Sequence, residues 1–393
     1  MRILVVAVAF APSFAFGGAP KVAYDLAKEL AKRNHDVVVY TSDAKDAYSR
    51  LSDAPLRFID GVEVHYFRNL TLASVRAAKQ FITPNLIETV QRCVQSFDVI
   101  HLHEYRSFQN IVVHHYAKKY GVPYLLQAHG SLMLDQTKRN MKRVFDGFFG
   151  YRLLRDASTL LALSKTEQWE YHQMAPHISV EVLPNGVDLS CYEVLPPKGA
   201  FRVRYGIPAD KRVILFLGRL HWKKGVDQLV NAYAYLTKNL HFHESTLCIV
   251  GPDDGFLKTL QTQVKFLNLQ DSIHFAGPLY GEDKLAALND ADVCVLPSRY
   301  EAFPMSALEA YACGKPVIAS KILGLQELVQ AAGGCLYESE NVRELAELLL
   351  GLLLDEEKAN TLGLMGKHYV KEHFSLQVVV DDLLRIYTEA MHS

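Results

Sequence analysis

Two glutamates, Glu301 and Glu309, stand eight positions apart in a segment whose residue types suit the binding of a polar ligand. An apolar run, residues 291–296, precedes them and predicts a buried strand. A helix closed by Gly314 is predicted after that strand. Both acids therefore flank a strand-to-helix turn, which is where parallel-sheet proteins bind their ligands.

The turn itself has the composition of an anion site. Pro304 suits the first helical position, where its missing N–H is no loss. Three residues then have free N–H groups that are able to point at one anion: Phe303, Met305 and Ser306. Glu301 is placed to accept hydrogen bonds from hydroxyls on one side of that anion, and Glu309 from hydroxyls on the other. A diphosphate flanked by a sugar and a ribose matches this arrangement.

Residues 296–318 resemble the signature of the retaining, nucleotide-sugar-dependent glycosyltransferases of family 4. The resemblance implies the GT-B fold, an α/β architecture of two Rossmann-like domains facing a central cleft. It also implies that Glu301 contacts the donor sugar, that Glu309 contacts the nucleotide ribose, and that residues 303–306 bind the diphosphate. Two acids at this spacing are by themselves more often a surface pair, and it is the full string that favours the site. Ala302 and Pro304 stand where glycine is common, which implies one backbone donor fewer at the phosphate.

A second loop carries two cations. Residues 218–225 follow a predicted strand at 213–217 and resemble the family's phosphate-binding loop. The resemblance assigns Arg219 and Lys224 to holding the departing nucleoside diphosphate, where they would spread the charge that grows as the glycosidic bond breaks. A solvated basic loop is the alternative interpretation.

In the first half of the chain, the resemblance implies further site residues. Gly18 precedes a helix predicted from about residue 21 and is assigned to the donor side. His129, after a strand-like run, matches a histidine that lies beside the donor sugar, and a structural histidine is the alternative. His103 and Glu104 are candidates for the acceptor pocket, and the backbone around Leu279 is a candidate for the base pocket. The Gly17-Gly18 pair lacks the Gly-x-Gly-x-x-Gly pattern, which argues against a nicotinamide or flavin enzyme.

Strand-like runs alternate with helical stretches along the whole chain, which indicates two parallel-sheet domains. Turn formers at 183–199 mark the boundary, with an N-terminal acceptor domain at 1–185 and a C-terminal nucleotide-sugar domain at 195–374. An amphipathic helix is predicted at 375–393, and the resemblance implies that it packs back on the first domain. Ten strands are predicted: 3–9, 37–41, 99–103, 124–128, 159–163, 213–218, 246–250, 273–275, 293–296 and 316–319.

Composition sets limits on the function. A chain of 393 residues is long enough for two domains, and a net charge of −1 argues against nucleic acid as a partner. The six cysteines show no metal or disulfide spacing, so a cytoplasmic location and no metal are expected. The apolar N-terminus is interpreted as the first strand and not as a signal peptide, because a helix and a second strand follow it.

Residues 138–155 combine six cations with Phe145, Phe148, Phe149 and Tyr151 at roughly helical spacing. Such a segment is able to dock on anionic lipid headgroups on the inner face of the cell membrane and reach a lipid-linked acceptor. The alternative, slightly favoured, is a helix whose aromatic side chains are core and whose cations are solvated.

Together these features predict a retaining, metal-independent glycosyltransferase of cell-surface glycan synthesis. It would use a UDP-sugar or GDP-sugar, with no further cofactor, and a glycan or lipid-linked acceptor. A nucleotide-sugar epimerase would share the donor site without an acceptor pocket. A non-catalytic sugar- or nucleotide-binding protein would tolerate the loss of Lys224 or Glu301.

Overall fold

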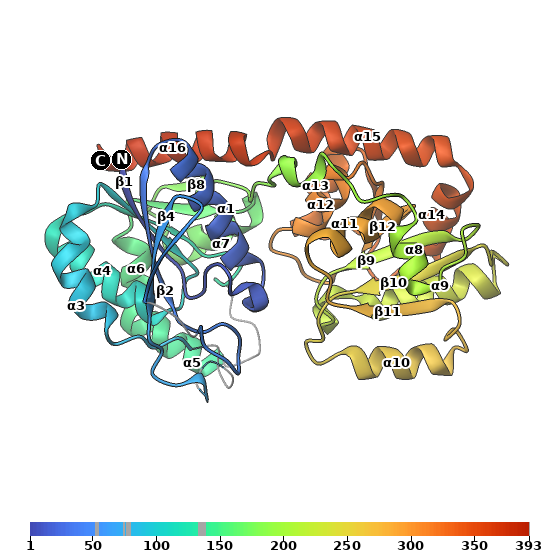
Figure 1. Ribbon diagram of the computed structural model, residues 1–393, viewed down its shortest axis with the longest axis horizontal. Helices are drawn as coiled ribbons and strands as arrows, with labels where there is room; N and C mark the ends of the chain where they lie inside the picture. The colour runs from blue at the N-terminus through green and yellow to red at the C-terminus, as the bar shows by residue number, and fades with distance from the viewer. Residues whose placement is uncertain (52–54, 74, 76–79, 133–138, 393) are drawn as a thin grey trace. The chain divides into compact units, whose positions relative to one another are not determined.

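The computed structural model describes residues 1–51, 55–73, 75, 80–132 and 139–392, and the chain divides into two compact units. Unit 1 comprises Met1–Gly186 and Leu376–Ser393, and unit 2 comprises Val187–Ser375 (Figure 1). Each unit is built on one sheet of its own.

Unit 1 contains a sheet of eight strands in the order β3-β4-β2-β1-β5-β6-β7-β8. All neighbours are parallel except β3 and β4, which form an antiparallel hairpin. The strands are β1 Arg2–Val6, β2 Asp36–Ser42, β3 Leu56–Ile59, β4 Val62–Phe67, β5 Val99–His103, β6 Tyr124–Gln127, β7 Thr159–Ala162 and β8 Val180–Val182. The α-helices are α1 Gly18–Lys32, α3 Leu86–Cys93, α4 Phe108–Tyr120, α5 Arg139–Phe145, α6 Tyr151–Arg155, α7 Lys165–Met174 and α16 Leu376–Met391, with a π-helical turn at Asp146–Gly150.

Unit 2 contains a parallel sheet of six strands in the order β11-β10-β9-β12-β13-β14. The strands are β9 Arg212–Leu217, β10 Ser245–Val250, β11 Ile273–Gly277, β12 Val293–Leu296, β13 Val317–Ser320 and β14 Cys335–Tyr337. The α-helices are α8 Ala200–Tyr205, α9 Val226–Lys238, α10 Leu257–Phe266, α11 Gly281–Asp290, α12 Met305–Ala312, α13 Leu323–Ala331, α14 Val342–Leu354 and α15 Glu356–His373.

Strand β9 explains why the parallel strands could be found in the sequence. Its residues alternate between two apolar clusters, with Val213 and Leu215 in one and Ile214 and Phe216 in the other, and all four are buried. A parallel strand covered on both faces is apolar at every position, and therefore reads as a continuous apolar run. All ten predicted strands are confirmed, although the first ends at Val6 and not at residue 9.

The order of unit 2 reverses between β9 and β12. Strands added after β9 first lie to one side, as β10 and β11, and then to the other, as β12 to β14. After β9 the chain continues to one side of the sheet, and after β12 it continues to the other. The adjacent carboxyl ends of β9 and β12 therefore mark the topological switch point, where open parallel sheets bind ligands. The predicted cations follow β9 and the predicted glutamates follow β12.

Helix α16 belongs to unit 1 although it follows α15 of unit 2 in the chain. It lies along α1 and also packs against β5 and β6 (Figure 1). Arg33 at the end of α1 is ion-paired with Asp381 and donates a second hydrogen bond to the carbonyl of Gln377 at 2.9 Å. The chain therefore leaves unit 1 at Gly186 and returns to it at Leu376.

Candidate functional site

Lys224 and Glu301 meet at the switch point of unit 2. Lys224 ends a short helical turn after β9, and its ammonium is hydrogen-bonded to Oε2 of Glu301, 77 positions away. Ser298 Oγ donates to the same oxygen at 3.3 Å. The two charged side chains are only 21% and 12% exposed, so each depends on the other for neutralisation. The fold thus brings together one cation and one acid that were predicted from separate motifs.

Two glycines allow these loops to approach so closely. Gly225 has a φ of +63°, and a Cβ placed on it would stand 1.9 Å from the carbonyl oxygen of Pro297. A Cβ on Gly324, in the first turn of α13, would stand 1.8 Å from the carbonyl oxygen of Glu301. Neither glycine was singled out from the sequence, because the contact partners are distant in the chain. Both positions exclude any side chain.

Arg219 lies in the same loop as Lys224 but has a different partner. Its Nη1 donates to Oδ2 of Asp254 at 2.6 Å, and both side chains are well exposed, at 50% and 38%. Gly251, at the end of β10, has a φ of +148°, and a Cβ there would stand 1.8 Å from the carbonyl oxygen of Gly218. The backbones of the loops after β9 and β10 are therefore in contact directly before Arg219. An exposed ion pair of this kind contributes little stability, so Arg219 is able to leave Asp254 and bind a polyanion.

The helix α12 begins one residue later than expected. Pro304 takes the position before the first helical residue, which is Met305. The N–H of Met305 donates to the carbonyl of Phe303 at 3.2 Å, so this donor is used inside the turn. Among the described residues, no acceptor lies in hydrogen-bonding reach of the N–H groups of Phe303 and Ser306. Two of the three predicted donors are therefore free for an anion.

Glu309 lies in the second turn of α12 and is paired with a lysine that the sequence did not indicate. Lys284 of α11 donates to Glu309 Oε1 at 2.8 Å, and both side chains are largely buried. The pair holds the carboxylate in a fixed place and leaves its second oxygen for another donor. Leu279, near the start of α11, is 9% exposed and belongs to the core, so its side chain does not face solvent.

In unit 1, the predicted residues lie at or after the carboxyl ends of β1, β5 and β6, and His103 is itself the last residue of β5. Gly18 is the first residue of α1, and a Cβ on it would meet open space. The preceding Gly17 has a φ of +117° and is the position that requires glycine. Glu104 directly follows β5 with a φ of +63°, and its carbonyl accepts from Asn110 Nδ2 at 2.6 Å.

His103 and His129 are in direct contact. His103 Nδ1 lies 2.8 Å from His129 Nε2, and the two ring planes are 9° apart with centroids separated by 5.1 Å, so the rings meet edge to edge. His103 is 1% exposed, whereas His129 is partly exposed. Burial lowers the pKa of His129 to about 4 and that of His103 well below its ordinary value, so both rings are neutral near pH 7.

A buried acid that the sequence did not reveal supports the turn around His129. Glu167 of α7 accepts hydrogen bonds from the N–H of Gly130 at 2.6 Å and of Leu163 at 2.7 Å. Burial raises the pKa of Glu167 to about 7, against the opposite effect of those two hydrogen bonds. The signal that could have found it is its place in the first turn of a helix that directly follows β7.

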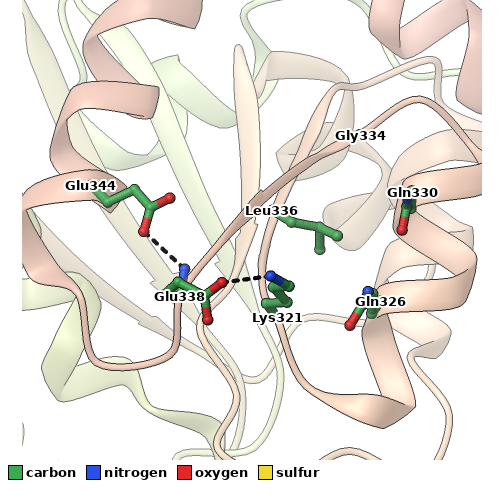
Figure 2. A pocket seen from close by; sticks show the side chains of 7 residues that line it. All are labelled: Lys321, Gln326, Gln330, Gly334, Leu336, Glu338 and Glu344. Carbon is green, nitrogen blue, oxygen red and sulfur yellow. Dashed lines mark hydrogen bonds and ion pairs between the residues drawn. The ribbon is translucent and has the colours of Figure 1, made fainter.

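A separate pocket of about 440 Å³ lies at the β14 edge of unit 2 (Figure 2). Figure 2 shows that Lys321 and Glu344 both face Glu338. Lys321 Nζ donates to Glu338 Oε1 at 2.6 Å, and Glu344 accepts from the backbone N–H of Glu338 at 2.9 Å. None of the predicted site residues lines it. Its lining carries two carboxylates, Glu338 and Glu344, against one lysine, so its net negative charge makes it a poor site for an anionic ligand.

The basic and aromatic segment is helical over the described residues 139–155, and Lys138 lies outside them. Phe145 packs against the core of unit 1, but the other three rings face solvent: Phe148 is 68% exposed, Phe149 44% and Tyr151 52%. The interpretation that its aromatic side chains are core is therefore wrong for these three. Across the described residues, no helix is long and apolar enough to span a bilayer.

Comparison with known proteins places this geometry in a class. The fold matches the structure of Anabaena Alr3699/HepE in complex with UDP and glucose with a TM-score of 0.80, at 23% identity and over 99% of this chain and 100% of that one. Sucrose-phosphate synthase from Thermosynechococcus elongatus gives a TM-score of 0.77 at 22% identity, over 99% and 98% of the two chains. The two units therefore have the GT-B fold of glycosyltransferases.

Sequence comparison defines the family. Residues 197–368 match the model "Glycosyl transferases group 1" and residues 16–190 match "Glycosyltransferase Family 4". A D-inositol 3-phosphate glycosyltransferase of Thermobispora bispora is 31% identical in an alignment of 316 residues that covers 75% of this chain and 71% of that protein. One from Kineococcus radiotolerans is 26% identical over 95% of this chain and 91% of that protein. The chain belongs to glycosyltransferase family 4, and it is a glycosyltransferase.

Proposed function

We propose that this glycosyltransferase moves a sugar from a nucleoside-diphosphate sugar to an acceptor hydroxyl, with retention of configuration and without a metal ion. The observation that carries the proposal is the Lys224–Glu301 pair at the switch point of unit 2, next to the start of α12, where the N–H groups of Phe303 and Ser306 are free. A cation, free amides and an acid are what a diphosphate with a sugar attached requires.

In the proposed mechanism, Lys224 and Arg219 bind the diphosphate and stabilise the negative charge that develops as it leaves. Each now pairs with an acid, Glu301 or Asp254, and binding of the diphosphate would draw the cation toward phosphate oxygens. Glu301 is then released to accept hydrogen bonds from sugar hydroxyls. Two cations perform the task that a divalent metal performs in other transferases, which supports metal independence.

Glu309 is proposed to bind the ribose. Lys284 occupies one of its oxygens, so the other is left to accept from a hydroxyl. His129 is proposed to contact the donor sugar, Gly18 and residues 303–306 the remaining parts of the donor, and the backbone around Leu279 the base. Glu104 remains a candidate for the acceptor side, whereas His103, 1% exposed, reaches a substrate only through its contact with His129. The attacking hydroxyl loses its proton to a leaving phosphate oxygen, on the same face from which the diphosphate departs.

The donor is proposed to be a UDP-sugar or a GDP-sugar. Anabaena HepE, a match in fold, is described in complexes with UDP and with UDP-glucose, which supports UDP as the first nucleotide to test. The acceptor is proposed to be a glycan or lipid-linked precursor. The exposed Phe148, Phe149 and Tyr151, set among exposed arginines, support peripheral attachment to an anionic membrane in the cytoplasm.

The deciding experiment is a thermal-shift series with UDP, GDP, ADP and their common sugars, each with and without EDTA. A nucleotide that binds the folded protein raises its melting temperature through mass action. We expect one nucleotide class to respond in EDTA, and Lys224→Ala and Glu309→Ala to abolish the response. If no nucleotide raises the melting temperature, or if the rise requires a metal ion, the proposal is contradicted. With an acceptor in hand, the anomeric configuration of the product, measured by NMR, tests retention.

A further inference from the structure

Three histidine rings lie in a row inside unit 1. His101 and His103 project from the same face of β5, and their rings stack with centroids 4.1 Å apart. His103 in turn meets His129, which follows β6, edge to edge, with the two ring planes 9° apart. At the other end of the row, Nδ1 of His101 lies 2.8 Å from the hydroxyl of Tyr387 on α16. The row runs from a fully buried tyrosine to a partly exposed histidine.

The backbone holds His129 in an unusual conformation. Its φ is +53°, in the left-handed region that residues other than glycine seldom occupy. The turn is fixed on both sides of it, because the N–H of Ala128 donates to Tyr171 Oη at 2.9 Å and the N–H of Gly130 donates to Glu167. The surroundings therefore fix the position of the His129 ring, which a role in binding requires.

The contact between His103 and His129 must have a direction. Both rings are neutral, so each carries a single N–H. The 2.8 Å contact between His103 Nδ1 and His129 Nε2 therefore has one donor and one acceptor. The direction decides which nitrogen of His129 carries its proton.

The other nitrogen of His103 settles the direction. Nε2 of His103 is buried and has no hydrogen-bond partner among the described residues. If His129 were the donor, the single proton of His103 would sit on that nitrogen and form a buried N–H without an acceptor. Such orphaned donors are rare in folded proteins, whereas an unpaired lone pair is better tolerated. The proton of His103 therefore belongs on Nδ1, from which it donates to His129.

We propose that His103 is a positioning residue that fixes the tautomer of His129, so that Nδ1 of His129 carries a proton and donates it in a hydrogen bond to an oxygen of the bound donor sugar. The substrate contact in this inference depends on the proposed function, whereas the tautomer does not. His103 is 1% exposed, so it acts on the substrate only through the partly exposed His129.

Nitrogen-15 NMR of the imidazole rings tests the tautomer without any substrate. The signals of His129 are assigned as those missing from His129→Asn, in protein labelled only at histidine. We expect wild type at pH 7.5 to show His129 protonated at Nδ1 and unprotonated at Nε2. Wild-type protein with the proton on Nε2 overturns the proposal, and this measurement needs no variant of His103.

Two substitutions of His103 separate positioning from packing. His103→Asn places an amide donor near the position of Nδ1 and should keep the tautomer, whereas His103→Leu fills the space without a donor and should shift His129 toward the Nε2–H form. We expect His103→Leu to lower kcat/KM for transfer by about 10-fold and His103→Asn by less than about 3-fold, at similar melting temperatures.

These experiments distinguish a failure of the tautomer assignment from a failure of the proposed function. If His103→Leu leaves the tautomer of His129 unchanged, His103 does not fix it and the proposal is wrong. If the tautomer shifts but transfer is unaffected, the substrate contact is wrong. If wild type has the expected tautomer and transfers no sugar from any nucleotide, then the proposed function fails, and with it the substrate contact, while the assignment of the proton stands.

Discussion

At the scale of single residues, the Lys224–Glu301 pair makes a sharp prediction about transfer. Lys224→Ala removes the cation proposed to stabilise the leaving diphosphate, and it leaves the carboxylate of Glu301, 12% exposed, without its partner. Loss of one such electrostatic contact typically lowers kcat by about 100-fold or more. We expect a fall of that size in steady-state transfer assays with saturating donor.

Lys223 is the matched control, because it is a lysine in the same helical turn and its ammonium lies over the ring of Tyr300, 5.4 Å from the centroid. Lys223→Ala should retain transfer within about 3-fold, since its ammonium lies over the ring of Tyr300 and removing that cation–π contact costs little energy. Equal losses in both variants would show that the total positive charge of the loop matters and not the position of Lys224.

Glu167 predicts a dependence of stability on pH. Burial raises its pKa from the ordinary 4.5 to about 7, so between these values the unfolded chain has released a proton that the folded chain still holds. The stabilising contribution is therefore complete below pH 4.5 and is lost as pH rises toward 7, by roughly 3 kcal/mol. Chemical denaturation of wild type and Glu167→Gln at pH 5 and pH 7.5 should show their stability difference shrinking at the higher pH. A difference that grows with pH would mean that the two backbone hydrogen bonds outweigh burial.

At the scale of elements, the loop after β9 depends on a glycine that no side chain can replace. Gly225→Ala combines a φ of +63° with a Cβ only 1.9 Å from the carbonyl of Pro297, so the loop that carries Lys224 must move. Gly206→Ala is the control, because its φ of +64° is the same but nothing lies within 4 Å of its Cβ. We expect denaturation to show a loss of about 1 kcal/mol for Gly206→Ala and clearly more for Gly225→Ala. Donor binding should fall only in Gly225→Ala, and equal effects in the two variants would contradict the close approach.

The segment 139–155 predicts binding to anionic vesicles. Phe148→Ser with Phe149→Ser removes two exposed rings whose burial in the headgroup region would favour binding, so affinity should fall by at least about 10-fold in sedimentation with phosphatidylglycerol vesicles. Phe266→Ser, at a ring 84% exposed on α10 of unit 2, is the control and should bind like wild type. If the wild-type protein does not bind these vesicles, or if it binds phosphatidylcholine vesicles equally well, electrostatic docking is ruled out.

The same scale shows what the sequence could predict. Buried parallel strands were found because they are apolar throughout, as in β9. The hairpin β3–β4 was missed because its strands are not apolar throughout: β3 alternates between exposed and half-buried residues, and the first four residues of β4 between buried and half-buried ones. Asp60 and Gly61 between them, with φ values of +49° and +82°, are nevertheless a recognised hairpin signal. The contact of His103 with His129 could not be predicted from the sequence, because it depends on how β5 pairs with β6. In that pairing His103 lies opposite Gln127. The Lys284–Glu309 pair likewise depends on how α11 and α12 pack.

At the scale of the whole molecule, the return of α16 to unit 1 makes that unit discontinuous in sequence. Only Phe374 and Ser375 separate α15, which belongs to unit 2, from α16. Contacts within a unit, and not nearness in the chain, should decide which segments unfold together. Helix α16 packs on α1, β5 and β6 of unit 1, whereas α15 packs on α12 and α14 of unit 2.

Two leucine substitutions test this. Leu383 of α16 and Leu349 of α14 are both 0% exposed, so each change to alanine should cost about 2–5 kcal/mol in its own unit. By hydrogen exchange with mass spectrometry, Leu383→Ala should speed exchange in α16, α1 and β5 while α15 keeps its protection. Leu349→Ala should do the reverse, because α14 packs on α15 and on the strands of unit 2. If either substitution speeds hydrogen exchange in α15 and α16 together, the two units unfold cooperatively and the division at Ser375 does not separate two units of stability.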